Sequence, residues 1–452
     1  MKINSIYHSY FKLINGLIFG IVLLILTILN PVLAFRYDCR LYWELTHSLD
    51  SDGVFSLLNF KEALRGVLFS IFLYPSLKIS QVFYWNEILT CRVYLIAIYS
   101  VSFSWLLPYA YKAFLGKELQ SVRHVILGML LLIFWWEYFT LPLSDMLGMI
   151  LLFTSFFLLL EKKWIFFILS GICLYASINM RLVYILCIPF YITYLVISVD
   201  GIANKIKVTI IAFIGFLLMV APQWFINHNN FNSYTWFVPT QASQATGGKS
   251  LLLMQLNWGL SIQKYETNID TIYPTPEVKY LDPSGVNLSG IHGNKDFIST
   301  SEYLDFVFHH PIIFKVYLKH LFNGFDITTP KAYLTGDIYQ RSIVLRLLNY
   351  TIIFLGLTVL LLRWKSMEKR NLLFIGMVGF LIAAVVPTAL EVRFFLPAQI
   401  LIYFMVISIS KTDYTMAKKN GFLIIVLYLC FIGSANYLSN DTLHQIEFTQ
   451  KH

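Results

Sequence analysis

Long apolar runs separated by short polar segments dominate the pattern of this chain. Eleven runs approach the twenty or so residues that cross a ~30 Å hydrocarbon layer as a helix. The predicted spans are residues 13–34, 88–111, 124–140, 145–160, 164–179, 182–199, 207–226, 345–362, 371–389, 393–410 and 420–437. A twelfth run, residues 66–82, is short and contains Pro75 and Lys78, so it could lie in the interface or re-enter. The pattern predicts an all-α polytopic integral membrane protein.

Basic residues between the spans predict the orientation. If residues 66–82 do not cross and the N-terminus is cytoplasmic, the cytoplasmic segments contain most of the positive charge. These residues are Lys2, Lys12, Lys112, Lys117, Arg123, Lys162, Lys163, Lys205, Lys207, Arg363, Lys365, Lys369, Arg370, Lys411, Lys418 and Lys419. If residues 66–82 crossed, this charge would lie outside, against the positive-inside bias. We therefore expect eleven spans, a cytoplasmic N-terminus and a periplasmic C-terminus.

This topology places two large segments on the outer face, residues 35–87 and 227–344. A loop of more than a hundred residues is usually functional or separately folded. The expected organisation is an N-terminal transmembrane module (1–226) that includes outer loop 35–87, a large periplasmic loop (227–344), and a C-terminal membrane part (345–452) with a short outer tail.

Composition excludes several classes of function. Of 452 residues, 57% are hydrophobic and only 13% are charged, about half the charged fraction of a soluble protein. The net charge of +9 lies mostly in the short cytoplasmic loops, so it reflects topology and does not predict a nucleic-acid partner. Four of the five cysteines lie in apolar runs, which excludes a disulfide framework, and no phosphate-binding glycine motif is present.

The strongest candidate chemistry follows the first span. In the run from Phe35 to Glu44, Asp38 stands between Arg36 and Arg40 and precedes Tyr42. Such a run is an interfacial belt of charged and aromatic residues, or it is a site where an acid kept ionised by arginines serves as a general base.

These residues resemble the membrane glycosyltransferases of the GT-C fold, which have an acid a few residues before a tyrosine in the first outer loop. Further similar stretches follow in order: Leu64–Phe69 with Arg65, Leu141–Asp145, Gly171–Arg181, and Ala389–Pro397 with Glu391 and Arg393. Some have simpler explanations, since Asp145 could cap a helix, Arg181 could snorkel, and Glu391 could pair with Arg393.

The resemblance implies a sugar transferred from a polyprenyl-phosphate donor to a glycan or glycolipid acceptor, on the outer face of a bacterial inner membrane. Asp38 would be the base, and Asp145 would orient the acceptor. The phosphate and substrate contacts would come from Arg36, Arg40, Tyr42, Arg65, Arg181, Glu391 and Arg393. No metal ligands are assigned, because Cys39 replaces the second acid of the motif. Whether the reaction uses a divalent cation is left open. An O-antigen polymerase, a lipid-linked oligosaccharide flippase and a purely structural membrane partner are the alternatives.

Overall fold

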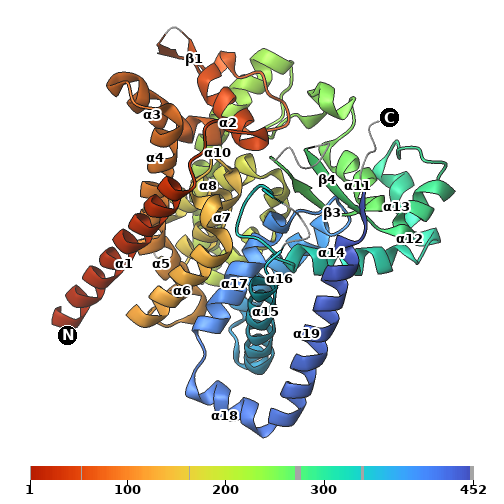
Figure 1. Ribbon diagram of the computed structural model, residues 1–452. Coiled ribbons are helices and arrows are strands. Elements are labelled where there is room, and N and C mark those ends of the chain that lie inside the picture. Colours follow the sequence, from red (N-terminus) through yellow and green to blue (C-terminus); the bar gives the residue numbers. More distant parts are fainter. Residues whose placement is uncertain (1, 52, 162, 270–275, 337–340, 448–452) are drawn as a thin grey trace. The chain divides into compact units, whose positions relative to one another are not determined.

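The computed structural model consists mostly of helices joined by short turns (Figure 1). It describes residues 2–51, 53–161, 163–269, 276–336 and 341–447. The chain divides into two compact units, Met1–Ala245 with Lys369–Met377 (unit 1) and Thr246–Glu368 with Val378–His452 (unit 2).

Unit 1 contains the helices of the N-terminal half and one short hairpin. Its elements are α1 (Lys2–Leu29), α2 (Tyr37–Ser48), β1 (Asp50–Ser51), β2 (Val54–Phe55), α3 (Val67–Phe83), α4 (Glu87–Val101), α5 (Leu107–Leu115), α6 (Ser121–Trp135), α7 (Ser144–Leu158), α8 (Trp164–Met180), α9 (Ile188–Ser198) and α10 (Ile202–Phe231). A π-helical turn, Ser102–Leu106, makes α4 and α5 continuous.

Glycines allow α8 and α10 to pack at close range. A Cβ added at Gly171 of α8 would lie 1.9 Å from the carbonyl oxygen of Ala212, and one added at Gly215 of α10 would lie 2.0 Å from that of Ile168. Small residues at a crossing let two apolar helices pack backbone against backbone, which is how membrane helices associate without a hydrophobic drive.

Unit 2 contains the large loop and the C-terminal helices. Its elements are α11 (Leu251–Ser261), β3 (Ile262–Thr267), β4 (Glu277–Leu281), α12 (Pro283–Ile291), α13 (Thr300–His309), α14 (Ile313–Phe325), α15 (Ile343–Arg363), α17 (Leu396–Ile407), α18 (Lys411–Lys419), α19 (Gly421–Leu443) and β5 (Ile446–Glu447). Helix α16 (Lys369–Val385) begins in unit 1 and ends in unit 2.

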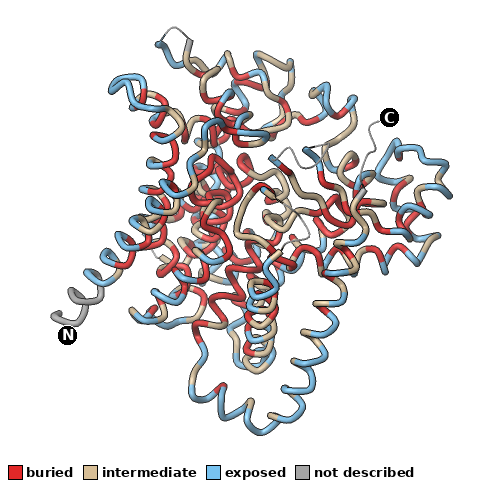
Figure 2. Tube along the Cα trace, in the orientation of Figure 1, coloured by how far each residue is buried: buried red, intermediate tan, exposed pale blue. Residues whose placement is uncertain are grey.

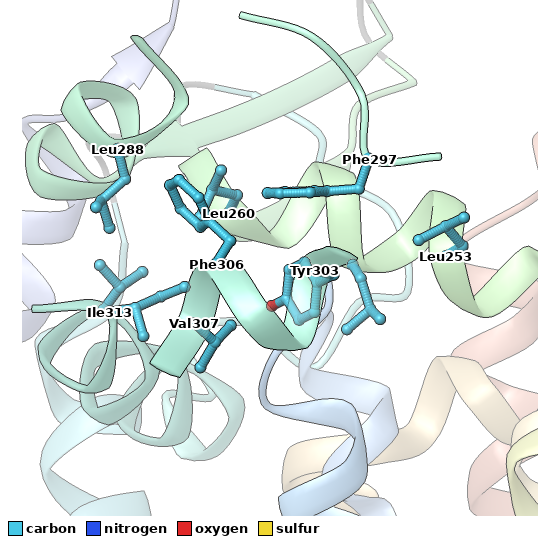
Figure 3. Packing of buried hydrophobic residues seen from close by; sticks show 10 residues of the cluster. Leu253, Leu260, Leu288, Phe297, Tyr303, Phe306, Val307 and Ile313 are labelled. Atoms are coloured by element: carbon cyan, nitrogen blue, oxygen red, sulfur yellow. The ribbon is translucent and has the colours of Figure 1, made fainter. Parts of the chain in front are cut away.

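The predicted loop 227–344 has its own hydrophobic core. Figure 3 shows side chains of α11, α12, α13 and α14 meeting around Phe297 and Phe306, which pack with their ring centroids 5.3 Å apart. This loop is therefore a folded subdomain, as its length suggested.

A small antiparallel sheet connects this loop to the C-terminal tail. Strand β4 pairs with β3 on one side and with β5 on the other. The loop and the tail therefore lie on the same side of the unit 2 helices. An even number of membrane crossings between them, such as the four predicted between residues 345 and 437, would place them on the same side of the membrane.

A buried ionic network fixes the end of the loop against this sheet. Both Nη atoms of Arg341 donate to the Glu266 carboxylate, at 2.6 and 3.1 Å. Lys264 lies 3.4 Å from the same carboxylate. Burial opposes the charge on Glu266, but Arg341 and Lys264 outweigh it and lower its pKa to about 2.

Six helical stretches among the described residues are long and apolar enough to cross a membrane, or seven if one bent pair is counted. They are Tyr10–Leu29, Glu87–Leu115, Ser121–Phe139, Ile202–Phe231, Ile343–Ser366, Gly421–Leu443, and the pair Val392–Ile407 with Lys411–Lys419, bent by 92°. The predicted spans 145–160, 164–179 and 182–199 fall on shorter apolar helices, and 371–389 falls on the 17-residue α16. A helical polytopic membrane protein is confirmed as the class, while eleven crossings stay a prediction.

Candidate functional site

Asp38 lies in the first turn of α2, directly after a strained residue. Tyr37 has φ 46°, in the left-handed region that costs a non-glycine residue roughly 1–2 kcal/mol. The Asp38 carboxylate accepts a hydrogen bond from Arg65 Nη2, and the two side chains form an ion pair. Burial opposes the charge on Arg65, but Asp38, Tyr42 and Glu62 together outweigh it, so the pKa of Arg65 is raised.

Arg65 is held in place by the residue that follows it. Gly66 packs directly against the end of α8, because a Cβ at this position would lie 2.1 Å from the carbonyl oxygen of Asn179. The next two backbone N–H groups donate to side chains, Val67 to Gln223 Oε1 at 3.1 Å and Leu68 to Asn179 Oδ1 at 2.9 Å. These bonds cap α3 and fix the backbone that carries Arg65.

The capping side chains form a buried ladder of amides. Asn179 Nδ2 donates to Gln223 Oε1 at 2.8 Å, and Gln223 Nε2 donates to Asn227 Oδ1 at 2.8 Å. Asn227 Nδ2 in turn donates to the carbonyl oxygens of Thr235 and Phe237, both at 2.8 Å. We call Asn179, Gln223 and Asn227 the amide ladder. It joins the ends of α8 and α10 to the start of α3.

A second ion pair lies next to the first. Tyr42, one turn beyond Asp38, shares a 2.8 Å hydrogen bond with Ser144 at the start of α7. The next residue, Asp145, forms a 3.0 Å ion pair with Arg181, which directly follows α8. The Arg65 guanidinium also lies 5.4 Å from the centre of the Tyr42 ring. We call Asp38, Tyr42, Arg65, Ser144, Asp145 and Arg181 the two-pair cluster.

The two carboxylates of the cluster differ in their access to solvent. The Asp38 side chain is 26% exposed, whereas that of Asp145 is 3% exposed. The side chains of Arg65 and Arg181 are 22% and 20% exposed. Solvent can therefore reach Asp38 and both arginines, whereas the Asp145 carboxylate is buried in its ion pair with Arg181.

Four further predicted site residues are not among the contacts of this cluster. Arg36 is exposed just before α2, and Arg40 is exposed and pairs with Glu44 at 2.6 Å. Glu391 and Arg393 belong to unit 2, where Arg393 Nη2 donates to Glu391 Oε1 at 2.9 Å and the two side chains form an ion pair with a closest distance of 2.7 Å. The structure thus brings together Asp38, Tyr42, Arg65, Asp145 and Arg181.

The donor set of the cluster does not suit a divalent cation. Within the described part of the chain, no group of three or more His, Cys, Asp or Glu side chains could hold a metal. Asp38 and Asp145 each face an arginine, whose charge would repel a cation. The chemistry considered below therefore involves no metal step.

Ser144 and the amide ladder were missed as working parts of the site. Helix α7 has no side-chain cap, so Asp145 does not cap it, and the hydroxyl of the preceding residue, Ser144, bonds to Tyr42. Gln223 and Asn227 could have been noticed as polar residues at the end of an apolar span, where such groups are costly and usually paired.

No protein-family model, no curated protein and no solved structure matches the chain.

Proposed function

We propose that this protein is a membrane glycosyltransferase that moves a sugar from a polyprenyl-phosphate donor to a glycan or glycolipid acceptor at the outer face of a bacterial inner membrane. The observation that carries the proposal is the two-pair cluster, in which a reachable carboxylate and two reachable arginines lie together at helix ends.

The cluster has the groups that this reaction needs. The acceptor hydroxyl loses its proton to the Asp38 carboxylate while its oxygen attacks the anomeric carbon of the sugar. The bond between that carbon and the phosphate oxygen breaks, and polyprenyl phosphate leaves with the bonding electrons. A phosphate leaving group is a stable anion, so no acid catalyst is required.

The arginines have the complementary task of holding that phosphate. Guanidinium groups bind phosphate oxygens through two parallel hydrogen bonds, and partial burial strengthens the attraction. Arg65 would exchange part of its contact with Asp38 for the donor, which frees the carboxylate to act as a base. Asp145 is too buried to reach an acceptor, so in this proposal it positions Arg181.

The test is the mass of the surface glycan in a strain that lacks the gene. The strain is complemented with the wild-type chain, with Asp38→Asn, or with Asp305→Asn, a control at a carboxylate that is 76% exposed in unit 2. We expect one added sugar unit with the wild type and with the control, and none with Asp38→Asn at equal membrane abundance.

Other outcomes identify the alternatives. A change in glycan chain length would indicate a polymerase. An unchanged glycan mass with lipid-linked intermediates on the inner leaflet would indicate a flippase. Full addition by Asp38→Asn would remove Asp38 from the role of base.

A further inference from the structure

Helix α14 has two faces that differ in packing. Ile313 and Val316 are fully buried in the core of the loop subdomain (Figure 3). Phe314, Leu318 and Leu321 are 54%, 67% and 37% exposed. Their spacing of four and three residues aligns them along one side of the helix. A stripe of large apolar side chains on an exposed helix marks contact with an apolar partner.

The C-terminal end of α14 is bonded to two helices that can cross a membrane. Thr442 Oγ1, in the last turn of α19, donates to Asn323 Oδ1 at 3.1 Å. Asn349 Nδ2, in the second turn of α15, donates to the Phe325 carbonyl oxygen at 2.6 Å. Figure 1 shows α14 beside the end of α19 opposite to the end that α18 occupies. The helix is thus attached at a defined level along the two spans.

Helix lengths give that level relative to the membrane. Helix α19 begins at Gly421, shortly after Lys418 and Lys419 at the end of α18, and Thr442 follows Gly421 by 21 residues, or roughly 32 Å at 1.5 Å per residue. The hydrocarbon layer is about 30 Å thick, and headgroups extend it to about 40–45 Å. If the lysines lie among the headgroups of one leaflet, the bond between Thr442 and Asn323 lies at the headgroup level of the other.

We propose that α14 lies in the headgroup layer of the outer leaflet and buries Phe314, Leu318 and Leu321 among the upper acyl chains. The partner is the lipid surface itself, continuous with the lipid that surrounds α19, few of whose residues are buried (Figure 2). This inference does not depend on the proposed catalytic activity.

The charges beside the stripe suit this position. Lys315 is exposed next to Phe314, where its ammonium group can reach lipid phosphates. Lys319 instead turns toward the subdomain and pairs with Asp282 at 2.8 Å. The helix therefore presents an apolar stripe flanked by one available cation, the pattern of a helix that lies in a membrane interface.

The test uses a fluorophore attached to single cysteines. In the full chain, Cys173 and Cys430 are replaced by alanine, and the buried Cys39, Cys91 and Cys187 stay unlabelled. An environment-sensitive NBD group is attached at Phe314→Cys, Leu318→Cys or Leu321→Cys, with Lys315→Cys as the matched control. Each protein is reconstituted into vesicles of phosphatidylethanolamine and phosphatidylglycerol, with iodide on both sides or with doxyl-labelled lipid.

We expect the three stripe positions to be quenched by doxyl lipid and to be at least about threefold less accessible to iodide than the Lys315 position. Equal iodide quenching at all four positions would overturn the proposal, because the stripe would then face water. Protection of the stripe from both quenchers would also overturn it, because protein and not lipid would then cover α14.

Discussion

Replacing Gln223 by methionine tests the amide ladder by removing its central member with little change in volume. Gln223 is fully buried and makes three hydrogen bonds, with the Val67 N–H, Asn179 Nδ2 and Asn227 Oδ1. The methionine leaves all three partner groups buried and unsatisfied. Each costs about 1–3 kcal/mol, so we expect Gln223→Met to lower the free energy of unfolding by at least about 3 kcal/mol.

A second buried glutamine provides the matched control. Gln399 of α17 is also fully buried, but its side-chain amide has no hydrogen-bond partner among the described residues. Gln399→Met removes a buried amide whose loss of hydration is not compensated by any hydrogen bond among the described residues. We therefore expect this variant to be as stable as the wild type or more stable.

The assay is reversible unfolding in mixed micelles of a mild detergent and sodium dodecyl sulfate, followed by circular dichroism. The reasoning predicts a large difference between the two glutamine variants. A loss below about 1 kcal/mol for Gln223→Met, or an equal loss for both variants, would refute the claim that the ladder stabilises unit 1.

Two further predictions use the same unfolding assay. Gly66→Ala places a Cβ 2.1 Å from the Asn179 carbonyl oxygen and should lower the free energy of unfolding by at least about 2 kcal/mol. In the control Gly290→Ala, the added Cβ meets nothing within 4 Å, so stability should hardly change. Equal losses of stability in the two variants would contradict the close packing at Gly66. Burial opposes the charge on Glu266, but mainly Arg341 overcomes this effect and lowers the pKa of Glu266 from 4.5 to about 2. The ionised carboxylate therefore stabilises the folded protein fully above pH 4.5, and this stabilisation is lost as the pH falls toward 2. Stability should therefore fall by about 3 kcal/mol over that window, and Glu266→Gln should lose this part of the pH dependence; an unchanged acid profile in the variant would contradict the role of the ion pair.

The sequence predicts the helices of this protein better than their contacts. Apolar runs locate the long helices because hydropathy is a local property. The shorter helices, such as α7 with 15 residues, carry the same apolar signal without the length of a span, so the number of crossings does not follow from it. Local chemistry is also predictable, as in the pairing of Arg40 with Glu44 four residues later.

The contacts of the site depend on residues far apart in the chain. Asp38 and Arg65 are 27 residues apart, Leu68 and Asn179 are 111 apart, and Val67 and Gln223 are 156 apart. No local pattern encodes these pairings, because they result from the packing of α3 against α8 and α10. Asp38 stands out in the sequence between two arginines, Arg65 and Arg181 were singled out through the resemblance, and the fold determines which carboxylate pairs with which arginine.

The most direct test of the proposed activity is transfer by the purified protein in vesicles. The vesicles contain a polyprenyl-phosphate donor with a radiolabelled sugar and a lipid-linked glycan acceptor from the host membrane. We predict that the label moves to the acceptor with release of polyprenyl phosphate. Asp38→Asn should slow this step by about 100-fold or more, and Asp305→Asn should not. Transfer by Asp38→Asn at the wild-type rate, or label that crosses the bilayer without forming a product, would contradict the account.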